Sequence, residues 1–410
     1  MRKLTAVWGV RMIKQQSFYN LKSFGFYVDK TREIYSMVKN HRSVLFVRPR
    51  KFGKSLLLAT LEELFSGNRE LFRDTYIYDE TDYDFKEYPV ITINLHLDVT
   101  KPSEFATSLK RIVKTLAKDR GLKLTADKPD ELLREFSYSF KEEVVVLIDN
   151  YDFVLADNIT NPEIEQLDQM LARFISVLND PEHFRFVFLT GINNFLLCEN
   201  EYGRVLEYDD LTLDPEVAEV CGITADELRL NYINKIVNLS SKTYVKAHGV
   251  DEIDAECFSH SKISQIYAEY LKQEEQRTED LVSIIMRTLG GYRFGPKQTN
   301  LASMGFVLEF LRGNGVFELN YDLRCARGYL VKKLQEDIFN IDSYAGVTMD
   351  PVIGCGPHYS YRPRLGSLLL HNGILTFASY EDIDGEVSTR LTIPNLEVQN
   401  FLAQRLKKKA

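Results

Sequence analysis

The sequence predicts an α/β fold in which a mostly parallel sheet comes first, a helical region follows, and a small α+β unit closes the chain. Two observations lead to this prediction. Up to about residue 200, short apolar runs alternate with segments of helical periodicity, a pattern typical of parallel sheets covered by helices on both faces. Beyond about residue 215 the strand signals fade and long helical segments replace them. We therefore expect two or three domains in the 410 residues.

Four apolar runs are expected to form the strands of the sheet, because almost continuous apolar stretches suit strands that are buried on both faces. They lie at residues 43–47, 88–98, 142–152 and 183–193. Helical periodicity predicts helices at residues 28–40, 55–65, 103–121, 130–140 and 161–179, and two longer ones at 222–247 and 262–291.

Residues 43–67 carry the motif that bears most on function. Gly53, Lys54 and Ser55 stand between an apolar strand and a helix, the context that a phosphate-binding loop needs. Backbone N–H groups at a helix N-terminus bind anionic oxygens. In such a loop the lysine reaches the β and γ phosphates, and the serine hydroxyl binds Mg²⁺. Arg48, however, stands where the first glycine of the usual G-x-x-x-x-G-K-[ST] pattern belongs.

Two further strand ends offer polar groups for the same site, because ligands of parallel sheets lie at the carboxyl ends of the strands. The run at 144–152 contains Asp149 directly after the apolar residues, where a carboxylate holds Mg²⁺ in nucleotide-binding proteins. A turn or a helix cap is the alternative for Asp149, and the upstream loop favours the metal role. Thr190 and Asn193 end another strand, either as sensors of a γ phosphate or as parts of a simple turn.

The order of elements predicts three parts. Residues 1–212 are expected to form a P-loop core, residues 213–350 a helical domain, and residues 351–410 a winged-helix-like subdomain. The last prediction rests on a helix, two strands joined by an acidic turn, and a closing helix near the C-terminus.

Composition narrows the class of protein. The net charge of −8 is spread along the chain, which does not suggest a protein built to wrap a phosphate backbone. The five cysteines are scattered and show no metal-ligand spacing. No apolar stretch is long enough to span a bilayer. We therefore expect a cytoplasmic protein without a membrane partner and leave a nuclear location open.

The segments "VLFVRPRKFGKSLLL", "VVVLIDNYD", "FLTGIN", "GYRF" and "LTIPNLEV" occur in an order and at a spacing that resemble the AAA-ATPase-like family of P-loop proteins, from about residue 20 to about residue 400. The family's usual loop is R-P-R-[RK]-F-G-K-S, so Arg48 matches the family. The resemblance implies an additional-strand P-loop core that binds ATP and Mg²⁺. The residues implied in cofactor binding are Arg50, Phe52, Gly53, Lys54, Ser55 and Leu56, with Ser55 and Asp149 as metal ligands.

Many relatives carry a restriction-type nuclease domain after the segment that resembles "LTIPNLEV". The sequence ends at Ala410, shortly after this segment. The expectation is therefore that no nuclease lies on this chain.

Three departures from the family pattern concern hydrolysis. Asn150 replaces the usual glutamate, and an amide can hold water but cannot accept its proton. Asn194 stands where the family has a cation that could stabilise phosphate charge. The usual W-Y-D-G-Y-[RK]-F segment is "TLGGYRF". These changes predict retained nucleotide binding with weak or absent hydrolysis.

Three hypotheses follow from the sequence. The first is an ATP-binding switch or scaffold with little turnover. The second is an active ATPase in which Asp152, or a residue of a neighbouring subunit, replaces the missing base, so that Asn150, Asp152 and Thr190 are the catalytic candidates. The third is a factor that binds a protein or nucleic acid through residues 360–405, where Arg390 and Arg405 and the lysines at 407–409 offer positive charge but the turn is acidic.

Overall fold

The computed structural model describes residues 18–195, 206–248, 260–313, 315, 317, 327–337, 365–383 and 386–407. Its centre is a five-stranded sheet with the strand order β2-β3-β4-β1-β5, in which all neighbouring strands are parallel. The strands are β1 (Ser43–Val47), β2 (Val90–Asn94), β3 (Val144–Asp149), β4 (Phe184–Gly191) and β5 (Asp209–Asp210). Strand β4 lies between β1 and β3, which confirms the additional strand.

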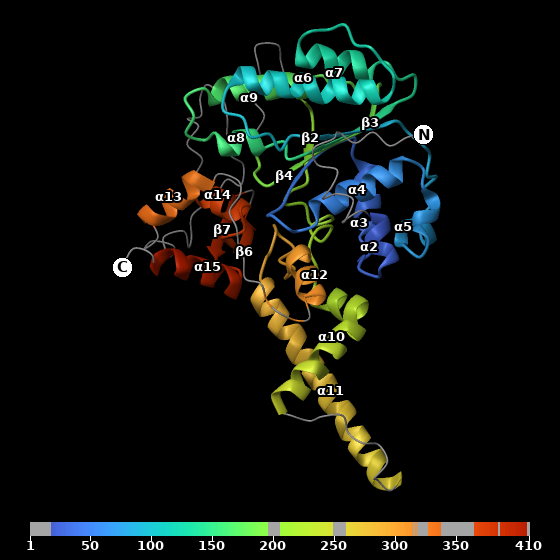
Figure 1. Cartoon of the computed structure of the whole chain (residues 1–410), viewed down its shortest axis with the longest axis vertical. Coiled ribbons are helices and arrows are strands. Elements are labelled where there is room, and N and C mark those ends of the chain that lie inside the picture. Colours follow the sequence, from blue (N-terminus) through green and yellow to red (C-terminus); the bar gives the residue numbers. More distant parts are fainter. Residues whose placement is uncertain are drawn as a thin grey trace.

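The alternation of side chains along β3 explains why the sheet is covered on both faces. Val144, Val146 and Ile148 belong to one hydrophobic cluster, whereas Val145 and Leu147 belong to another on the opposite face. The first face is covered by α6 (Pro102–Asp119), α7 (Pro129–Ser137) and α9 (Ile164–Ser176), and the second by α2 (Phe18–Ser23), α3 (Thr31–Asn40), α4 (Lys54–Phe65) and α5 (Tyr76–Asp79) (Figure 1). Two short elements complete these layers: α8 (Phe153–Asp157) contributes Phe153 to the first cluster, and η1 (Arg69–Phe72) contributes Phe72 to the second.

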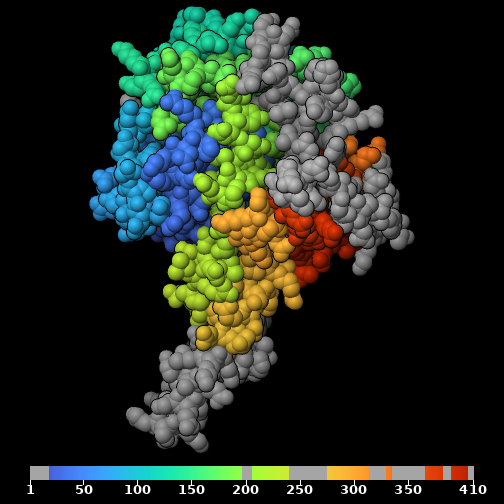
Figure 2. Space-filling model, turned by 180° about the vertical axis from the view of Figure 1, so that it is seen from behind, coloured from blue at the N-terminus to red at the C-terminus, as the bar shows by residue number. Residues whose placement is uncertain are grey.

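The helical region contains a long helical hairpin that projects from the body of the molecule (Figure 1). It consists of α10 (Ala225–His248) and α11 (His260–Leu289), and α12 (Met304–Arg312) and α13 (Arg327–Asp337) follow. A capping box begins α10, because the Thr224 hydroxyl accepts a bond from Glu227 N and the Glu227 carboxylate accepts one from Thr224 N. On the face seen in Figure 2, the yellow-green chain that leads from residue 206 into α10 lies between the blue N-terminal elements and the orange and red C-terminal elements.

The C-terminal part has the expected order of helix, two strands and helix. It is built from α14 (Leu365–His371), the antiparallel strands β6 (Thr376–Ile383) and β7 (Glu386–Thr392), and α15 (Leu396–Lys407). Leu368 and Ile374 are buried in the same hydrophobic cluster as Val144 of the sheet. The C-terminal part is therefore packed against the core, and its winged-helix-like character stays a prediction.

Some sequence features lie outside this description. Of the C-terminal cations, the structure describes the side chain of Arg390, which is exposed. The "YRPR" segment at 361–364, residues 384–385 of the turn and residues 408–410 lie outside the described residues. Within the described part of the chain, no helix is long and apolar enough to cross a bilayer.

Candidate functional site

The loop between β1 and α4 has the backbone geometry that an anion site needs. Gly53 precedes the helix in the left-handed region, with φ 106° and ψ 10°, where a side chain would be strained. A Cβ added to Gly53 would meet no atom within 4 Å, so the space beside it is open. The first backbone bond of the helix runs from Leu57 N to Gly53 O, so the amides before Leu57 have no carbonyl partner within the helix. These amides can donate hydrogen bonds to an anionic oxygen.

The predicted lysine lies within this loop. Lys54 is only 8% exposed, and its Nζ donates hydrogen bonds to the carbonyls of Arg48 at 2.8 Å and Pro49 at 3.0 Å. The loop carbonyls therefore hold the ammonium group at the helix N-terminus, where a bound phosphate would meet it.

The structure brings the two predicted metal ligands together. Ser55 Oγ donates to Asp149 Oδ2 across 3.3 Å. Burial raises the pKa of the Asp149 carboxyl, while Lys54 and the Ser55 hydroxyl oppose this effect. A hydroxyl and a carboxylate are oxygen ligands of the kind that Mg²⁺ accepts, together with waters and phosphate oxygens. Among the described residues, no group of three or more His, Cys, Asp or Glu side chains could hold a metal, so Mg²⁺ would need such additional ligands.

Arg48 holds the loop against other parts of the chain. Its guanidinium is buried and donates to the carbonyl of Thr212 at 2.6 Å and to that of Ala218 at 3.3 Å. It also lies over the rings of Phe46 and Phe294, at 4.3 and 4.2 Å from their centroids. Burial lowers the pKa of Arg48 to about 10. The arginine thus joins the loop to distant parts of the chain.

The other predicted cofactor residues divide into two kinds. Phe52 is buried and makes edge-to-face contacts with Tyr292 and Phe294, at centroid distances of 4.8 and 5.3 Å. This contact packs the "GGYRF" segment against the loop. Arg50 and Leu56 are half-buried beside the helix N-terminus.

A pocket lies next to the loop. Its walls come from α3 and the segment before it, from the loop and α4, from the segment before α10, and from the start of α12. The residues that line it are Tyr27, Val28, Lys30, Ile34, Phe52, Gly53, Leu56, Leu57, Thr60, Val220, Gly222 and Met304. The pocket is therefore mostly apolar, and both the core and the helical region contribute to it.

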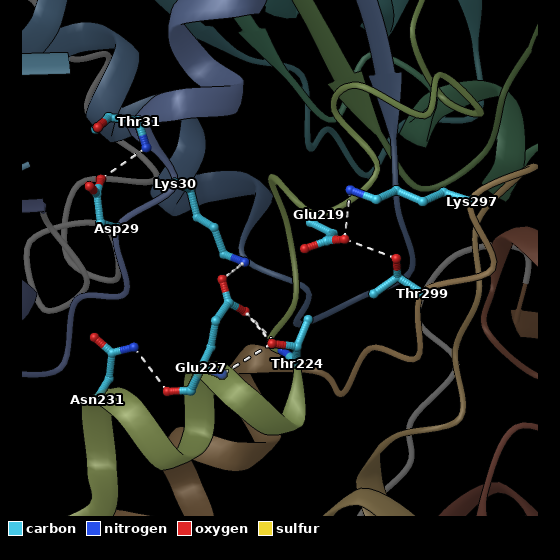
Figure 3. A network of polar contacts seen from close by, with 9 residues as sticks. All are labelled: Asp29, Lys30, Thr31, Glu219, Thr224, Glu227, Asn231, Lys297 and Thr299. Carbon is cyan, nitrogen blue, oxygen red and sulfur yellow. Dashed lines mark hydrogen bonds and ion pairs between the residues drawn. The ribbon is translucent and has the colours of Figure 1, made fainter. Parts of the chain in front are cut away.

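A polar network fixes one side of this pocket (Figure 3). Lys30, whose side chain is 8% exposed, forms an ion pair with Glu227, the residue that caps α10. The neighbouring Asp29 accepts a bond from Thr31 N at the start of α3. Lys30 and Glu227 are 197 positions apart, so the network connects the N-terminal segment to the projecting hairpin.

Asn150 follows β3 and adopts a left-handed backbone with φ 58°, a conformation that asparagine tolerates better than most residues. Its Nδ2 donates to Asn94 Oδ1 at 3.1 Å, at the end of the neighbouring strand. The amide holds this position without a group that can accept a proton from water.

The Asp152 carboxylate is hydrogen-bonded to the chain that follows β4. Its carboxylate accepts bonds from Ile192 N at 3.2 Å, Asn193 N at 2.7 Å and Asn193 Nδ2 at 2.8 Å. A Cβ on Gly191 would lie 2.1 Å from Asp152 Oδ1, so glycine is required for this close approach. Burial raises the pKa of Asp152, and the bonds from Asn193 oppose the shift. The geometry favours a positioning role for Asp152.

The remaining candidates at the end of β4 also have protein partners. Thr190 Oγ1 donates to Phe46 O at 2.7 Å and joins β4 to β1 below the loop. Asn193 Oδ1 accepts a bond from Asn372 Nδ2 at 3.0 Å, and Asn194 Nδ2 donates to Asp210 Oδ2 at 2.6 Å. The backbone N–H of Asn194 donates to His371 Nδ1 across 3.4 Å.

His371 and Asn372 were not predicted as part of this region. The signal available in the sequence was a polar pair directly after the apolar end of a helix, in "LLLHNG". Such a pair also fits an ordinary helix end, so only the fold shows that it meets β4.

Residues 13–199 match the family model described as predicted AAA-ATPase. This part of the chain belongs to that family. The AAA-ATPase-like segment includes Lys54, Ser55 and Asp149, whereas Gly222 and Met304 of the pocket lie beyond the match.

The chain is also similar to individual proteins. It is 31% identical over 210 residues to an uncharacterized protein from the vnfD 5′ region of Azotobacter chroococcum, covering 50% of this chain and 40% of that protein. The chain thus spans less than half the length of this relative.

Two solved structures are similar at low TM-scores. A Walker-type ATPase of Pyrococcus abyssi gives a TM-score of 0.38 at 13% identity, over 92% of this chain and 96% of the other. The ORC1 protein of Aeropyrum pernix in complex with DNA gives 0.26 at 13% identity, over 99% and 96%.

Proposed function

We propose that the chain binds ATP with Mg²⁺ and acts as a nucleotide-dependent switch or scaffold with weak or no hydrolysis. The observation that carries this proposal is the meeting of Lys54, Ser55 and Asp149 at the N-terminus of α4. The helix amides and Lys54 supply the positive side of a phosphate site. Ser55 and Asp149 supply oxygen ligands for Mg²⁺, which would screen the charge of the phosphates.

The adjacent pocket supports a nucleotide as the ligand. It shares Gly53, Leu56 and Leu57 with the phosphate loop, so a base could enter the pocket while its phosphates lie at the helix N-terminus.

Weak hydrolysis is supported by the groups at the ends of β3 and β4. Asn150 cannot act as a general base, and such help contributes about 10²- to 10⁴-fold in enzymes. Asp152, the second candidate, already accepts three hydrogen bonds from Ile192 and Asn193. A turnover that depends on Asp152, or on a residue from another copy of the chain, is the competing proposal.

The switch is supported by the composition of the pocket wall. Core residues such as Ile34 and Leu57 face the same space as Val220 and Met304 of the helical region. A nucleotide bound there would contact both parts and stabilise the arrangement in which they meet. A protein or a further copy of the chain that senses this arrangement is the partner class we propose.

Calorimetric titration with Mg·ATPγS tests the proposal. Wild type should bind, and Lys54→Ala should bind about 10- to 150-fold more weakly, since a hydrogen bond to a charged group contributes about 1.5–3 kcal/mol. Lys118→Ala, which removes an exposed lysine from α6, is the matched control and should bind like wild type.

Three outcomes contradict parts of the proposal. If wild type does not bind, nucleotide binding is refuted. If Lys54→Ala binds as tightly as wild type, the ligand binds somewhere other than the loop. Steady phosphate release from ATP that disappears in Asp152→Ala would establish the active ATPase in place of the weakly hydrolysing switch.

A further inference from the structure

Lys51 of the phosphate loop has a backbone conformation that residues outside the loop hold in place. Its φ of 63° lies in the left-handed region, which a lysine rarely adopts. Such a conformation persists only where the surrounding structure fixes it. The Lys51 carbonyl accepts hydrogen bonds from Gly305 N at 2.7 Å and from Ser303 Oγ at 3.1 Å. Both donors lie at the start of α12, and Ser303 is 252 positions further along the chain.

The same contact caps the N-terminus of α12. Ser303 is the N-cap residue of this helix, yet its hydroxyl makes no capping bond to the helix itself. The Lys51 carbonyl takes this role, because Gly305 N is one of the first helix amides, which have no carbonyl partner within the helix. The loop therefore caps α12, and α12 fixes the conformation of the loop.

The loop and α12 are also in close contact. A Cβ added to Gly305 would lie 2.9 Å from both the carbonyl oxygen and the Cβ of Lys51, so a larger residue at this position would displace the loop or the helix. The Lys51 ammonium group lies 4.3 Å from the ring centroid of Phe306 and forms an ion pair with Glu309. One helix thus holds Lys51 at its carbonyl and at its side chain.

These contacts determine which way the peptide groups of the loop point. Next to the bond from Gly305 to Lys51, Gly222 N donates to the carbonyl of Phe52 at 2.9 Å. In a trans peptide the N–H points opposite to the C=O, and the described part of the chain contains no cis peptide. The N–H groups of Phe52 and Gly53 are therefore turned away from the helical region.

The helix α12 is in turn packed against the projecting hairpin. Val307 and Phe310 of α12 belong to one hydrophobic cluster with Tyr232 of α10 and Ile285 of α11, and all four side chains are buried. A displacement of α12 by the loop would therefore also move side chains that pack on the hairpin.

We propose that Ser303 and Gly305 are positioning residues of the phosphate site, which hold the loop at Lys51 in the conformation that binds phosphate. Phosphate binding and the docking of α12 on the loop then strengthen each other, since coupling between two contacts is reciprocal. This inference rests on the proposed nucleotide binding and names the route by which that site acts on the hairpin. The coupling requires phosphates alone, because it runs through the loop backbone and not through the apolar pocket.

Two substitutions test the inference. Ser303→Ala removes one hydrogen bond to Lys51, and Gly305→Ala places a methyl group against Lys51 in a helix that alanine otherwise favours. The dissociation constants of Mg·ATPγS and Mg·tripolyphosphate are measured by calorimetry. We expect Ser303→Ala to weaken both by about 2- to 12-fold, the equivalent of one net hydrogen bond. Gly305→Ala should weaken both by about 5- to 150-fold, as overpacking does.

Hydrogen exchange provides a readout that a general loss of stability would not change. In wild type, Mg·tripolyphosphate should slow exchange of the Gly305 amide, which bonds to Lys51. It should slow the amides of α7 less, since α7 covers the face of the sheet opposite α4. In Ser303→Ala, the same ligand at saturation should protect the Gly305 amide less than in wild type. Equal protection of α7 and Gly305 in wild type would contradict the coupling.

Ser137→Ala is the matched control, because Ser137 is buried in α7 and its hydroxyl also donates to a backbone carbonyl, that of Arg134 at 3.2 Å. It should bind both ligands like wild type. Unchanged affinities in Ser303→Ala and Gly305→Ala would overturn the inference, as would an equal loss in Ser137→Ala; if Gly305→Ala does not fold, Ser303→Ala decides. Failure of the underlying proposal gives a different result, because wild type itself would then bind neither ligand, and the inference would fall with it.

Discussion

Arg48 gives the most direct test of how the phosphate loop is held. The structure assigns its guanidinium to the carbonyls of Thr212 and Ala218, so we expect that replacing it will lower the free energy of unfolding more than it affects nucleotide contacts. Two substitutions separate the contributions. Arg48→Ala removes the hydrogen bonds and most of the side-chain volume, whereas Arg48→Met removes the hydrogen bonds and the charge but keeps a long apolar side chain.

The expected change in the free energy of unfolding is the difference between the hydrogen bonds that Arg48 contributes and the cost of burying its charge. Hydrogen bonds to a charged group contribute about 1.5–3 kcal/mol each, and Arg48 makes two to distant carbonyls. Burial lowers its pKa from 12.5 to about 10, which corresponds to a cost of about 3 kcal/mol for burying the charge. Alanine avoids this cost but leaves a cavity and unpaired carbonyls, so we expect a loss of about 3–5 kcal/mol. Methionine fills the space and should cost about 1–2 kcal/mol.

Urea denaturation followed by circular dichroism measures both losses, with the slope of the transition checked for equal exposure of surface in each variant. A loss below about 1 kcal/mol for Arg48→Ala would refute the bracing role. A folded Arg48→Met protein that no longer binds Mg·ATPγS would show instead that Arg48 serves the phosphates.

Two further predictions concern single carboxyl and amide groups. Asn150→Glu should lower the free energy of unfolding by about 1 kcal/mol, because glutamate is strained in the left-handed backbone at φ 58°. Asn150→Gly tolerates this backbone and should be the more stable of the two variants in parallel urea titrations; the reverse order would contradict the explanation. Glu397 is buried near Lys51, and burial raises its pKa from 4.5 to about 7. The unfolded chain therefore loses this proton before the folded chain does, and this group reduces stability as pH rises from 4.5 to 7. Glu397→Gln should gain up to about 3 kcal/mol over wild type at pH 7.5 and little at pH 4.5, and a gain that is equal at both pH values would argue against a buried, titrating carboxyl.

The parallel sheet could be predicted because its signals are local. In the run 144–149, six consecutive residues are buried. A strand that is covered on both faces needs apolar residues at every position, so a continuous apolar run in the sequence is enough to predict it. The meeting of Ser55 with Asp149 was also predictable, because both follow strands whose carboxyl ends share one edge. In this respect the sequence contains enough information to bring together the side chains of the proposed phosphate and metal site.

The contacts around the loop could not be predicted in the same way. Arg48 meets Thr212 and Ala218, which are 164 and 170 positions away, and no periodicity connects such residues.

The hydrogen bonds of Asp152 could not be predicted either. Its carboxylate was a candidate base by proximity in sequence, but the close approach at Gly191 and the amides of Ile192 and Asn193 engage it in the structure. The direction of a side chain depends on packing partners that the local sequence does not reveal.

The position of the pocket explains why slow hydrolysis would not prevent a switch. A ligand shifts an arrangement of two parts only through its different affinity for the arrangements, and this requires contacts with both parts rather than turnover. Val220 and Met304 of the helical region line the same pocket as Ile34 of the core, so a nucleotide bound there would contact both parts. The ion pair of Lys30 with Glu227 then connects the pocket wall to the first turn of α10. On the proposal made above, ATP binding strengthens this junction, and the projecting hairpin of α10 and α11 is the element whose position reports it.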